Sequence, residues 1–217
     1  MPACPHTNTQ LIIKLKEMEF PFTYLEDIDF LRQVRTSVLD NLNRSPEGTS
    51  PEVTNGYLPN ERPLRRVFPQ GREPLVSLIK KQSCLEFVGF IGFVKNASEL
   101  DEGIKKEIWD VDLKLIEELQ EHANILGYFS AERTDGCNWG NLVVLNSFDA
   151  INEWRNSQTH ALAINLLSPR FYSKVRIHTG TLKDGFSGDL EVQKTIFIDY
   201  ESSLPPKRSV VYWENDI

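Results

Sequence analysis

The chain has 217 residues, of which 40% are hydrophobic and 25% charged, and its formal net charge is −7. This composition is typical of a globular protein, and the length allows one domain with extensions or two small domains. The acidic balance argues against general nucleic-acid binding and against docking on anionic membranes, because both need a basic surface.

Targeting and metal-binding patterns are missing from the sequence. No apolar run reaches the length of a membrane span, and residues 1–10 lack the basic and apolar segments of a signal peptide. The three cysteines, Cys4, Cys84 and Cys137, have no metal-like spacing and indicate free thiols in a reducing compartment. We therefore expect a cytoplasmic protein with no membrane partner and no metal site.

The first 83 residues predict an extension made of a helix and a long loop. Residues 11–20 favour a short strand. Residues 23–42 place apolar side chains at helical spacing, namely Leu25, Ile28, Leu31, Val34, Val38 and Leu42. Residues 43–63 are rich in Pro, Gly, Ser, Thr and Asn, and this composition predicts a long loop.

A regular alternation of strands and helices begins at residue 84. Residues 84–96 form a nearly continuous apolar run, which predicts a strand buried on both faces. Residues 98–122 predict a helix, with Ser98 as its N-cap and an apolar stripe of Leu100, Ile104, Ile108, Val111, Leu115 and Leu119. Residues 127–133 and 141–148 predict an antiparallel hairpin around the turn at 134–140.

The second half of the repeat predicts another helix and a strand. Residues 149–167 have helical spacing, and we expect this helix to end at Ser168-Pro169. Residues 172–182 predict a strand, and residues 191–202 add one more. Residues 205–217 predict a terminal arm or an extra edge strand. The organisation is thus an extension at 1–83, a central domain at 84–183 and a C-terminal strand and arm at 184–217.

The order strand, helix, strand, strand, helix, strand predicts an α+β, ferredoxin-like (βαββαβ) domain with both helices on one face of an antiparallel sheet. The other face is partly apolar, so we expect it to pack against a partner sheet. Strand 172–182 alternates Val175 and Ile177 with Arg176 and His178. Val175 and Ile177 would pack on the helices, and the basic pair would point into a chamber between two sheets.

Residues 85–182 resemble the dimeric α+β barrel superfamily, and within it the antibiotic-biosynthesis-monooxygenase-like proteins. The resemblance rests on residues 140–160, where His160 follows Trp154 by six positions, and on residues 171–180. It implies a homodimer formed through the sheets. It also leaves several chemistries open, since members include cofactor-free oxygenases of aromatic substrates, polyketide cyclases, haem-degrading proteins and other haem enzymes.

The candidate catalytic residues are His178, His160 and Arg176. An imidazole titrates near neutrality and can remove a proton, while a guanidinium can hold the resulting anion. His160 lies in the second predicted helix, near its C-terminal half. The haem-degrading branch is not indicated, because Ile164 stands ten residues after Trp154, where that branch has a histidine. The candidate substrate-binding residues are Trp154, Tyr172, Arg170 and Phe90.

These observations predict a small enzyme of specialised or aromatic metabolism that uses no organic cofactor. It would act on a small hydrophobic or aromatic substrate, as a monooxygenase-like, cyclase-like or isomerase-like enzyme that begins with proton abstraction in a hydrophobic chamber. Two alternatives stay open. One is a haem-dependent enzyme of the same superfamily with His178 or His160 as iron ligand, and the other is a non-catalytic protein that binds a small ligand. Trp139 and Asn141 flank the hairpin turn, and an exposed Trp there could mark a subunit contact.

Overall fold

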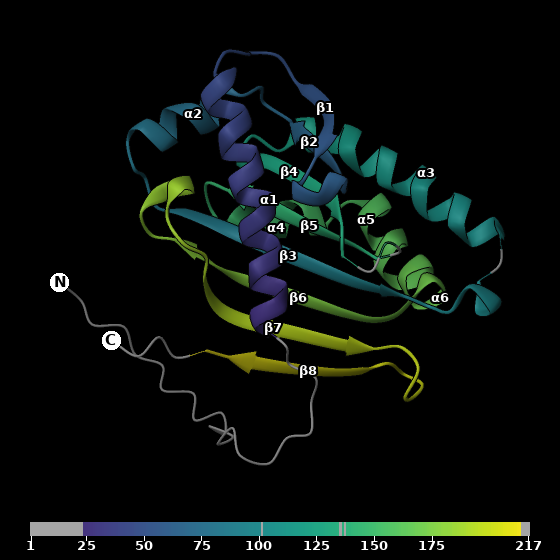
Figure 1. Cartoon of the computed structure of the whole chain (residues 1–217). Helices are drawn as coiled ribbons and strands as arrows, with labels where there is room; N and C mark the ends of the chain where they lie inside the picture. Colours follow the sequence, from purple (N-terminus) through teal and green to yellow (C-terminus); the bar gives the residue numbers. More distant parts are fainter. Residues whose placement is uncertain (1–23, 101, 135, 137, 214–217) are drawn as a thin grey trace.

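The computed structural model describes residues 24–100, 102–134, 136 and 138–213, and its centre is one antiparallel sheet (Figure 1). The sheet has eight strands in the order β1-β2-β4-β5-β3-β6-β7-β8. The strands are β1 (Glu52–Tyr57), β2 (Pro63–Phe68), β3 (Leu85–Val94), β4 (Ile125–Glu132), β5 (Trp139–Leu145), β6 (Tyr172–Leu182), β7 (Glu191–Asp199) and β8 (Lys207–Tyr212).

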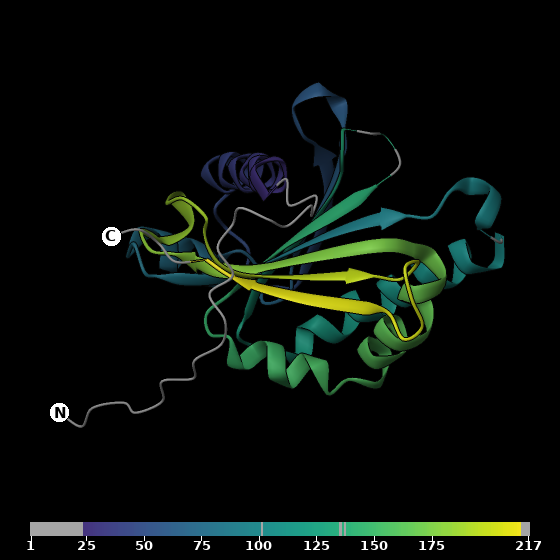
Figure 2. The ribbon, with the colours of Figure 1, turned by 90° about the horizontal axis from the view of Figure 1, so that it is seen from below.

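The inner strands β4-β5-β3-β6 come from the stretch in which the sequence predicted a repeat of strands and helices. Helix α3 (Glu102–Glu118) connects β3 to β4. The connection from β5 to β6 contains α4 (Asp149–Arg155), α5 (Gln158–Leu162), a π-helical turn (Ala163–Leu167) and α6 (Ser168–Phe171). Both connections cover the same face of the sheet (Figure 2). The mixed α+β architecture predicted from the sequence is thereby confirmed.

The second predicted helix is divided where polar residues interrupt it. α4 ends at Arg155, and Ser157 caps α5 by accepting a hydrogen bond from the backbone N–H of His160 at 3.1 Å. The helix does not end at Ser168-Pro169 as predicted. Pro169 lies in the first turn of α6, where a missing N–H is tolerated. Ser98 is likewise not the N-cap of α3, since it lies in a short 3₁₀ turn (Ala97–Glu99) before that helix begins.

The opposite face of the sheet is covered by α1 (Tyr24–Arg44), which belongs to the N-terminal extension (Figures 1 and 2). Its apolar stripe is buried against the sheet, as the helical spacing predicted, except that Leu25 is 70% exposed. The buried side chains of the stripe are Ile28, Leu31, Val34, Val38 and Leu42. A glycine makes the close approach possible, because a Cβ on Gly89 of β3 would overlap Leu31 Cδ1.

This cover changes the interpretation of the apolar sheet face. The sequence predicted that a partner's sheet would bury it, whereas α1 of the same chain buries it in the structure. The physical requirement was correct, since an open apolar face must be covered. A helix from the chain's own extension satisfies that requirement, so the apolar face no longer gives a reason to expect the predicted homodimer.

The extension contains more regular structure than its composition predicted. Residues 43–63 were expected to form a long loop, but β1 and β2 form an antiparallel pair that extends the sheet beside β4. In β1, half-exposed and exposed residues alternate, as in an edge strand with little burial. A further helix, α2 (Glu73–Lys80), follows β2. The strand predicted at residues 11–20 lies outside the described residues.

At the other end of the sheet, β7 and β8 confirm the strands expected after residue 190. β8 is the edge strand that was one of two interpretations of the C-terminal arm. No helix in the described part of the chain combines the length and the apolar character needed to cross a membrane.

Candidate functional site

Arg176 and His178 lie on the α1 face of β6, side by side, as the alternation predicted. Both are buried, with 4% and 0% of their surface exposed. They converge on Asp27 of α1, which is itself fully buried. Arg176 donates to both carboxylate oxygens, from Nε to Oδ2 at 2.5 Å and from Nη2 to Oδ1 at 2.7 Å, and His178 Nε2 lies 2.9 Å from Oδ2.

The imidazole of His178 is engaged at both nitrogens. Its Nδ1 lies 2.8 Å from Thr195 Oγ1, which also accepts a hydrogen bond from Trp213 Nε1 at 2.9 Å. Arg133 adds a longer contact of 3.3 Å to Asp27. Burial alone would raise the pKa of Asp27, but the hydrogen bonds from His178 and Arg176, together with their charges, hold that pKa below its ordinary value.

This buried cluster joins α1 to β6 rather than facing an open chamber. A general base must reach the proton that it removes, and α1 separates His178 from solvent in this structure. The predicted roles of His178 and Arg176 in catalysis therefore require α1 to leave the sheet, and they stay predictions. The geometry shows that Asp27 binds Arg176 and His178 and so holds α1 against the sheet.

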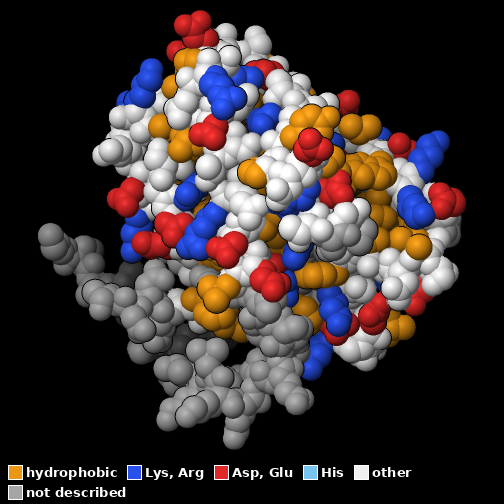
Figure 3. Space-filling model, viewed as in Figure 1, with side chains coloured by type: hydrophobic (Ala, Val, Ile, Leu, Met, Phe, Trp, Pro, Cys, Tyr) orange, Lys and Arg blue, Asp and Glu red, His pale blue; other side chains and the backbone are white. Residues whose placement is uncertain are grey.

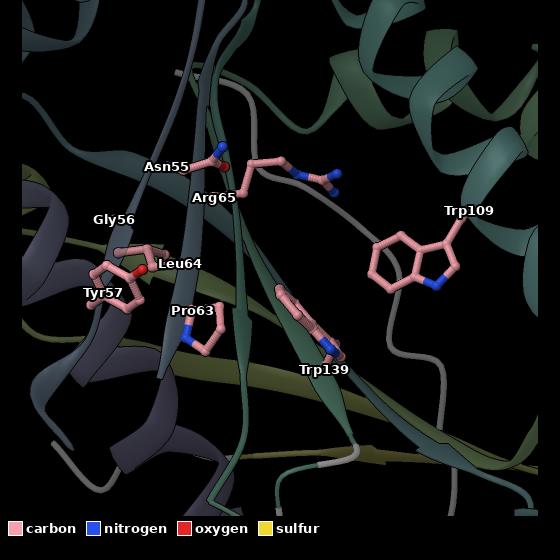
Figure 4. A pocket seen from close by; sticks show the side chains of 8 residues that line it. All are labelled: Asn55, Gly56, Tyr57, Pro63, Leu64, Arg65, Trp109 and Trp139. Carbon is pink, nitrogen blue, oxygen red and sulfur yellow. The ribbon is translucent and has the colours of Figure 1, made fainter. Parts of the chain in front are cut away.

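The other face of the sheet holds an open hollow with aromatic walls, which we call the tryptophan hollow (Figure 4). Its volume is about 460 Å³, within the usual range of small-molecule sites. It lies between the β1–β2 hairpin, the start of β5 and α3. Its lining includes Tyr57, Pro63, Leu64, Arg65, Trp109 and Trp139.

Two indole rings form one wall of the tryptophan hollow. Trp109 projects from α3 and Trp139 from the first position of β5, and their rings meet edge to face with centroids 5.7 Å apart. Trp109 is 45% exposed, which is unusual for so large an apolar side chain. Apolar side chains gather on the surface between the β1–β2 hairpin and α3 (Figure 3). Such a patch often marks a binding surface.

The polar element of the hollow is Arg65, which extends from β2 toward α3 (Figure 4). Its Nη2 donates to Asp112 Oδ2 at 2.5 Å, while its buried Nε has no hydrogen-bond partner. Asp112 Oδ1 accepts a hydrogen bond from the Tyr128 hydroxyl at 3.2 Å, and Asn141 Nδ2 donates to that hydroxyl at 2.8 Å. Burial and the charge of Asp112 raise the pKa of Tyr128, so the phenol stays protonated and can donate.

Two of the predicted substrate-binding residues lie on the same sheet face as the hollow. Phe90 of β3 and Tyr172 of β6 meet edge to face with ring centroids 5.6 Å apart. Burial, together with the charge of Asp112, raises the pKa of Tyr172. Phe90 and Tyr172 therefore belong to the aromatic layer between the sheet and the helices, but they are not among the residues that line the hollow.

Trp154 and His160 form a second aromatic pair on the helix side. Their rings are tilted by 43° to each other with centroids 4.8 Å apart, and Trp154 also meets Tyr128 edge to face with centroids 6.3 Å apart. Trp154 Nε1 and His160 Nδ1 are buried without a hydrogen-bond partner. Burial and the charge of Arg155 lower the pKa of His160, although Glu118 acts in the opposite direction. The surroundings of His160 therefore favour the neutral ring.

The remaining predicted substrate residue, Arg170, lies at the surface. It pairs with Glu107 at 2.9 Å, and about half of each side chain is exposed. Among the described residues, no three His, Cys, Asp or Glu side chains are arranged to hold a metal ion. The two histidines predicted as haem-iron ligands differ in their hydrogen bonding. Both ring nitrogens of His178 form hydrogen bonds, whereas His160 Nδ1 forms none.

Sequence reasoning missed Arg65 and Trp109, which line the tryptophan hollow, and Asp112, which pairs with Arg65. Trp109 lies off the apolar stripe of its helix, and a tryptophan in that position was a usable signal. Trp139, for which the sequence suggested a subunit contact, lines the hollow. Arg65 and Asp112 carried no signal, because ordinary charged residues on a strand and a helix look like solvated surface.

The comparisons with known proteins show only distant similarity. Neither models of known protein families nor curated proteins matched the chain. Among solved structures, protein SO0527 from Shewanella oneidensis has 14% identity and a TM-score of 0.37, and the match covers 46% of this chain and 91% of that one. A protein from Lactobacillus acidophilus, described as a "putative monooxygenase", has 8% identity and a TM-score of 0.36, with coverage of 78% and 91%.

Proposed function

We propose that the protein binds a flat, acidic or phenolic aromatic molecule in the tryptophan hollow. The observation that carries this proposal is the position of Arg65, which lines the hollow together with the two indole rings and whose buried Nε has no hydrogen-bond partner. Indole faces bind planar rings, and a guanidinium fork binds a carboxylate or a phenolate oxygen. Two indole rings beside one guanidinium do not favour a nucleic acid or an aliphatic ligand.

We further propose monooxygenase-like chemistry at this site, on a ferredoxin-like unit formed by β3, α3, β4, β5, α4–α6 and β6. Asp112 would take the phenolic or enolic proton, and Arg65 would stabilise the anion that remains. That anion is electron-rich and would react with dioxygen. One oxygen atom would enter the substrate as a carbonyl, the other would leave as water, and a CH₂ group of the substrate would supply the electrons.

Binding can be measured directly through tryptophan fluorescence. We expect hydroxylated aromatic acids, such as hydroxynaphthoates, to quench the emission saturably. Trp109→Phe and Trp139→Phe should each lose much of the quench, and Trp213→Phe should keep it, because Trp213 lies by Thr195 on the other face. Arg65→Met should weaken binding at least tenfold. A quench that is equal in all four variants would contradict the proposal.

An oxygen electrode separates the enzyme from the alternative of a non-catalytic binding protein. That alternative is favoured by one observation, namely that His178 lies outside the hollow. Consumption of dioxygen with a bound substrate, lost in Asp112→Asn, would support the enzyme. Saturable binding without oxygen consumption would support the binding protein. A Soret band on addition of haem, lost in His160→Gln but not in His178→Gln, would instead indicate a haem protein.

A further inference from the structure

A second hollow lies on the opposite side of the β1–β2 hairpin, between that hairpin and α1. We call it the α1 hollow, and its volume is also about 460 Å³. Two consecutive residues of β2 line different hollows, because successive side chains of a strand point to opposite faces of the sheet. Arg65 points into the tryptophan hollow, and Arg66 lines the α1 hollow together with Arg32, Ser37, Asn41 and Arg44.

Arg66 differs from the other buried arginines in the described part of the chain. Three arginines there are buried, namely Arg66, Arg72 and Arg176. Arg72 is held by Glu52 through two hydrogen bonds of 2.7 Å, and Arg176 is held by Asp27. For Arg66, no carboxylate oxygen of a described residue lies within ion-pair distance, although 93% of its surface is buried and only 7% exposed.

The hydrogen bonding of Arg66 is equally incomplete. Nη2 has one long bond of 3.3 Å to the Ser37 hydroxyl, and Nε is buried without any partner. Asn41 Oδ1, on the α1 wall of the hollow, is also buried and unpartnered. Burial and the positive charge of Arg72 both lower the pKa of Arg66, so its environment disfavours the cation.

A buried charge without a counter-charge is strongly unfavourable, and proteins ordinarily pair such a group. The side chain is nevertheless given room, since Gly56 of β1 lies under the guanidinium and a Cβ there would overlap Nη1. The Nε–Nη2 edge of the guanidinium is the edge that binds carboxylate or phosphate through two parallel hydrogen bonds. Arg44 at the exposed rim adds positive charge, while Asp40 on the same rim opposes it.

We propose that the α1 hollow binds a small oxyanion, the phosphate or carboxylate group of a metabolite-sized ligand, with Arg66 as its central ligand. The bound anion supplies the counter-charge that Arg66 lacks and links α1 to the β1–β2 hairpin. The site is separate from the tryptophan hollow, because it lies on the other side of the β1–β2 hairpin and its basic ligand is Arg66 rather than Arg65, although Tyr57 borders both hollows. Its test does not depend on the proposed chemistry there.

The experiment is a thermal-unfolding titration of the whole chain with inorganic phosphate and, separately, with malonate. Ionic strength is held constant with chloride, so that general screening is removed. We expect a saturable rise in the unfolding temperature of about 5 °C or more at 100-fold excess over the dissociation constant. The anion that saturates at lower concentration identifies the oxyanion class. No saturable rise with either anion would overturn the proposal.

Variants assign the effect to Arg66. Arg66→Met should abolish the anion-dependent rise without lowering the unfolding temperature in chloride, because it removes an uncompensated charge. Arg208→Met, at an exposed position of β8, should keep the full rise. Ser37→Asp gives a second test, since it places a carboxylate beside Arg66 Nη2 and should raise the unfolding temperature in chloride while removing the response to anions. An unchanged response in Arg66→Met or Ser37→Asp would overturn the proposal.

Discussion

Asp27 is the residue on which the contact between α1 and the sheet is centred. It is fully buried and accepts hydrogen bonds from Arg176, with His178 and Arg133 also in contact. A buried carboxylate is tolerable only when it is paired in this way. The same carboxylate compensates the buried charge of Arg176, so each group depends on the other.

We expect Asp27→Asn to destabilise the protein by about 3 to 5 kcal/mol at pH 7, because it leaves a buried guanidinium without its counter-charge. The pKa of Asp27 is lower in the folded than in the unfolded chain. Its contribution to stability is therefore complete above the unfolded pKa of about 4 and is lost as the pH falls below that value.

Urea unfolding at pH 7 and at pH 3 measures both effects. The wild type should lose more stability between these pH values than Asp27→Asn does. Asp29→Asn is the matched control, because Asp29 lies on the same helix but its side chain is 64% exposed and pairs only with Arg32 at the surface. Equal losses in Asp27→Asn and the wild type would show that the carboxylate is not the source.

His160 gives a second pH effect, in a different range. Its pKa is lower in the folded chain because burial disfavours the charged ring and Arg155 repels it. The folded state is therefore most stable above the unfolded pKa of about 6.5, and it loses stability as the pH falls toward the folded pKa. We expect His160→Phe, which keeps an aromatic ring against Trp154, to flatten the profile between pH 7 and pH 5. A flat wild-type profile would contradict this expectation.

The sequence pattern predicted the position of part of the cluster around Asp27 and missed the rest. Alternation along residues 172–182 was sufficient to place Arg176 and His178 on one face of the sheet. Their partner Asp27 lies 149 and 151 positions away along the chain, and no local pattern connects residues so far apart. A basic pair on a sheet face was therefore assigned to an inward-facing chamber, although in the structure it holds a helix.

Among the elements, α1 has the largest effect on the interpretation of the molecule. Its helical spacing was evident from the sequence, but spacing alone does not say which surface a helix covers. The β1–β2 hairpin was missed for another reason. An edge strand has few buried side chains, so its residues resemble a polar loop.

The contribution of α1 can be measured by shortening its buried side chains. Leu31→Ala should cost about 2 to 5 kcal/mol, because Leu31 is fully buried against β3 and its removal leaves a cavity beside Gly89. Leu25→Ala on the exposed side of the same helix should change stability by less than about 0.5 kcal/mol. Denaturant unfolding of both variants tests this difference. A similar, small effect for both would mean that α1 is only weakly attached.

At the scale of the whole molecule, the question is whether the sheet still needs a second copy of the chain. The predicted homodimer used the face that α1 now covers, and burial of that face within one chain removes the reason for pairing. The outer strand β8 ends the sheet with Lys207 and Arg208, both exposed, and charged side chains oppose pairing at an edge. The net charge of −7 adds a general repulsion between copies.

We therefore expect the protein to run with the mass of one chain, 24.9 kDa, in size-exclusion chromatography with light scattering. A mass of twice that value would show that the dimer forms in spite of α1. In that event Leu31→Asp distinguishes a dimer formed through the sheet face from a dimer formed elsewhere. A charge on the buried face of α1 should loosen the helix from the sheet. A dimer formed through the sheet face would then become tighter, whereas a dimer formed through the tryptophan hollow or a sheet edge would not gain from the loss of α1.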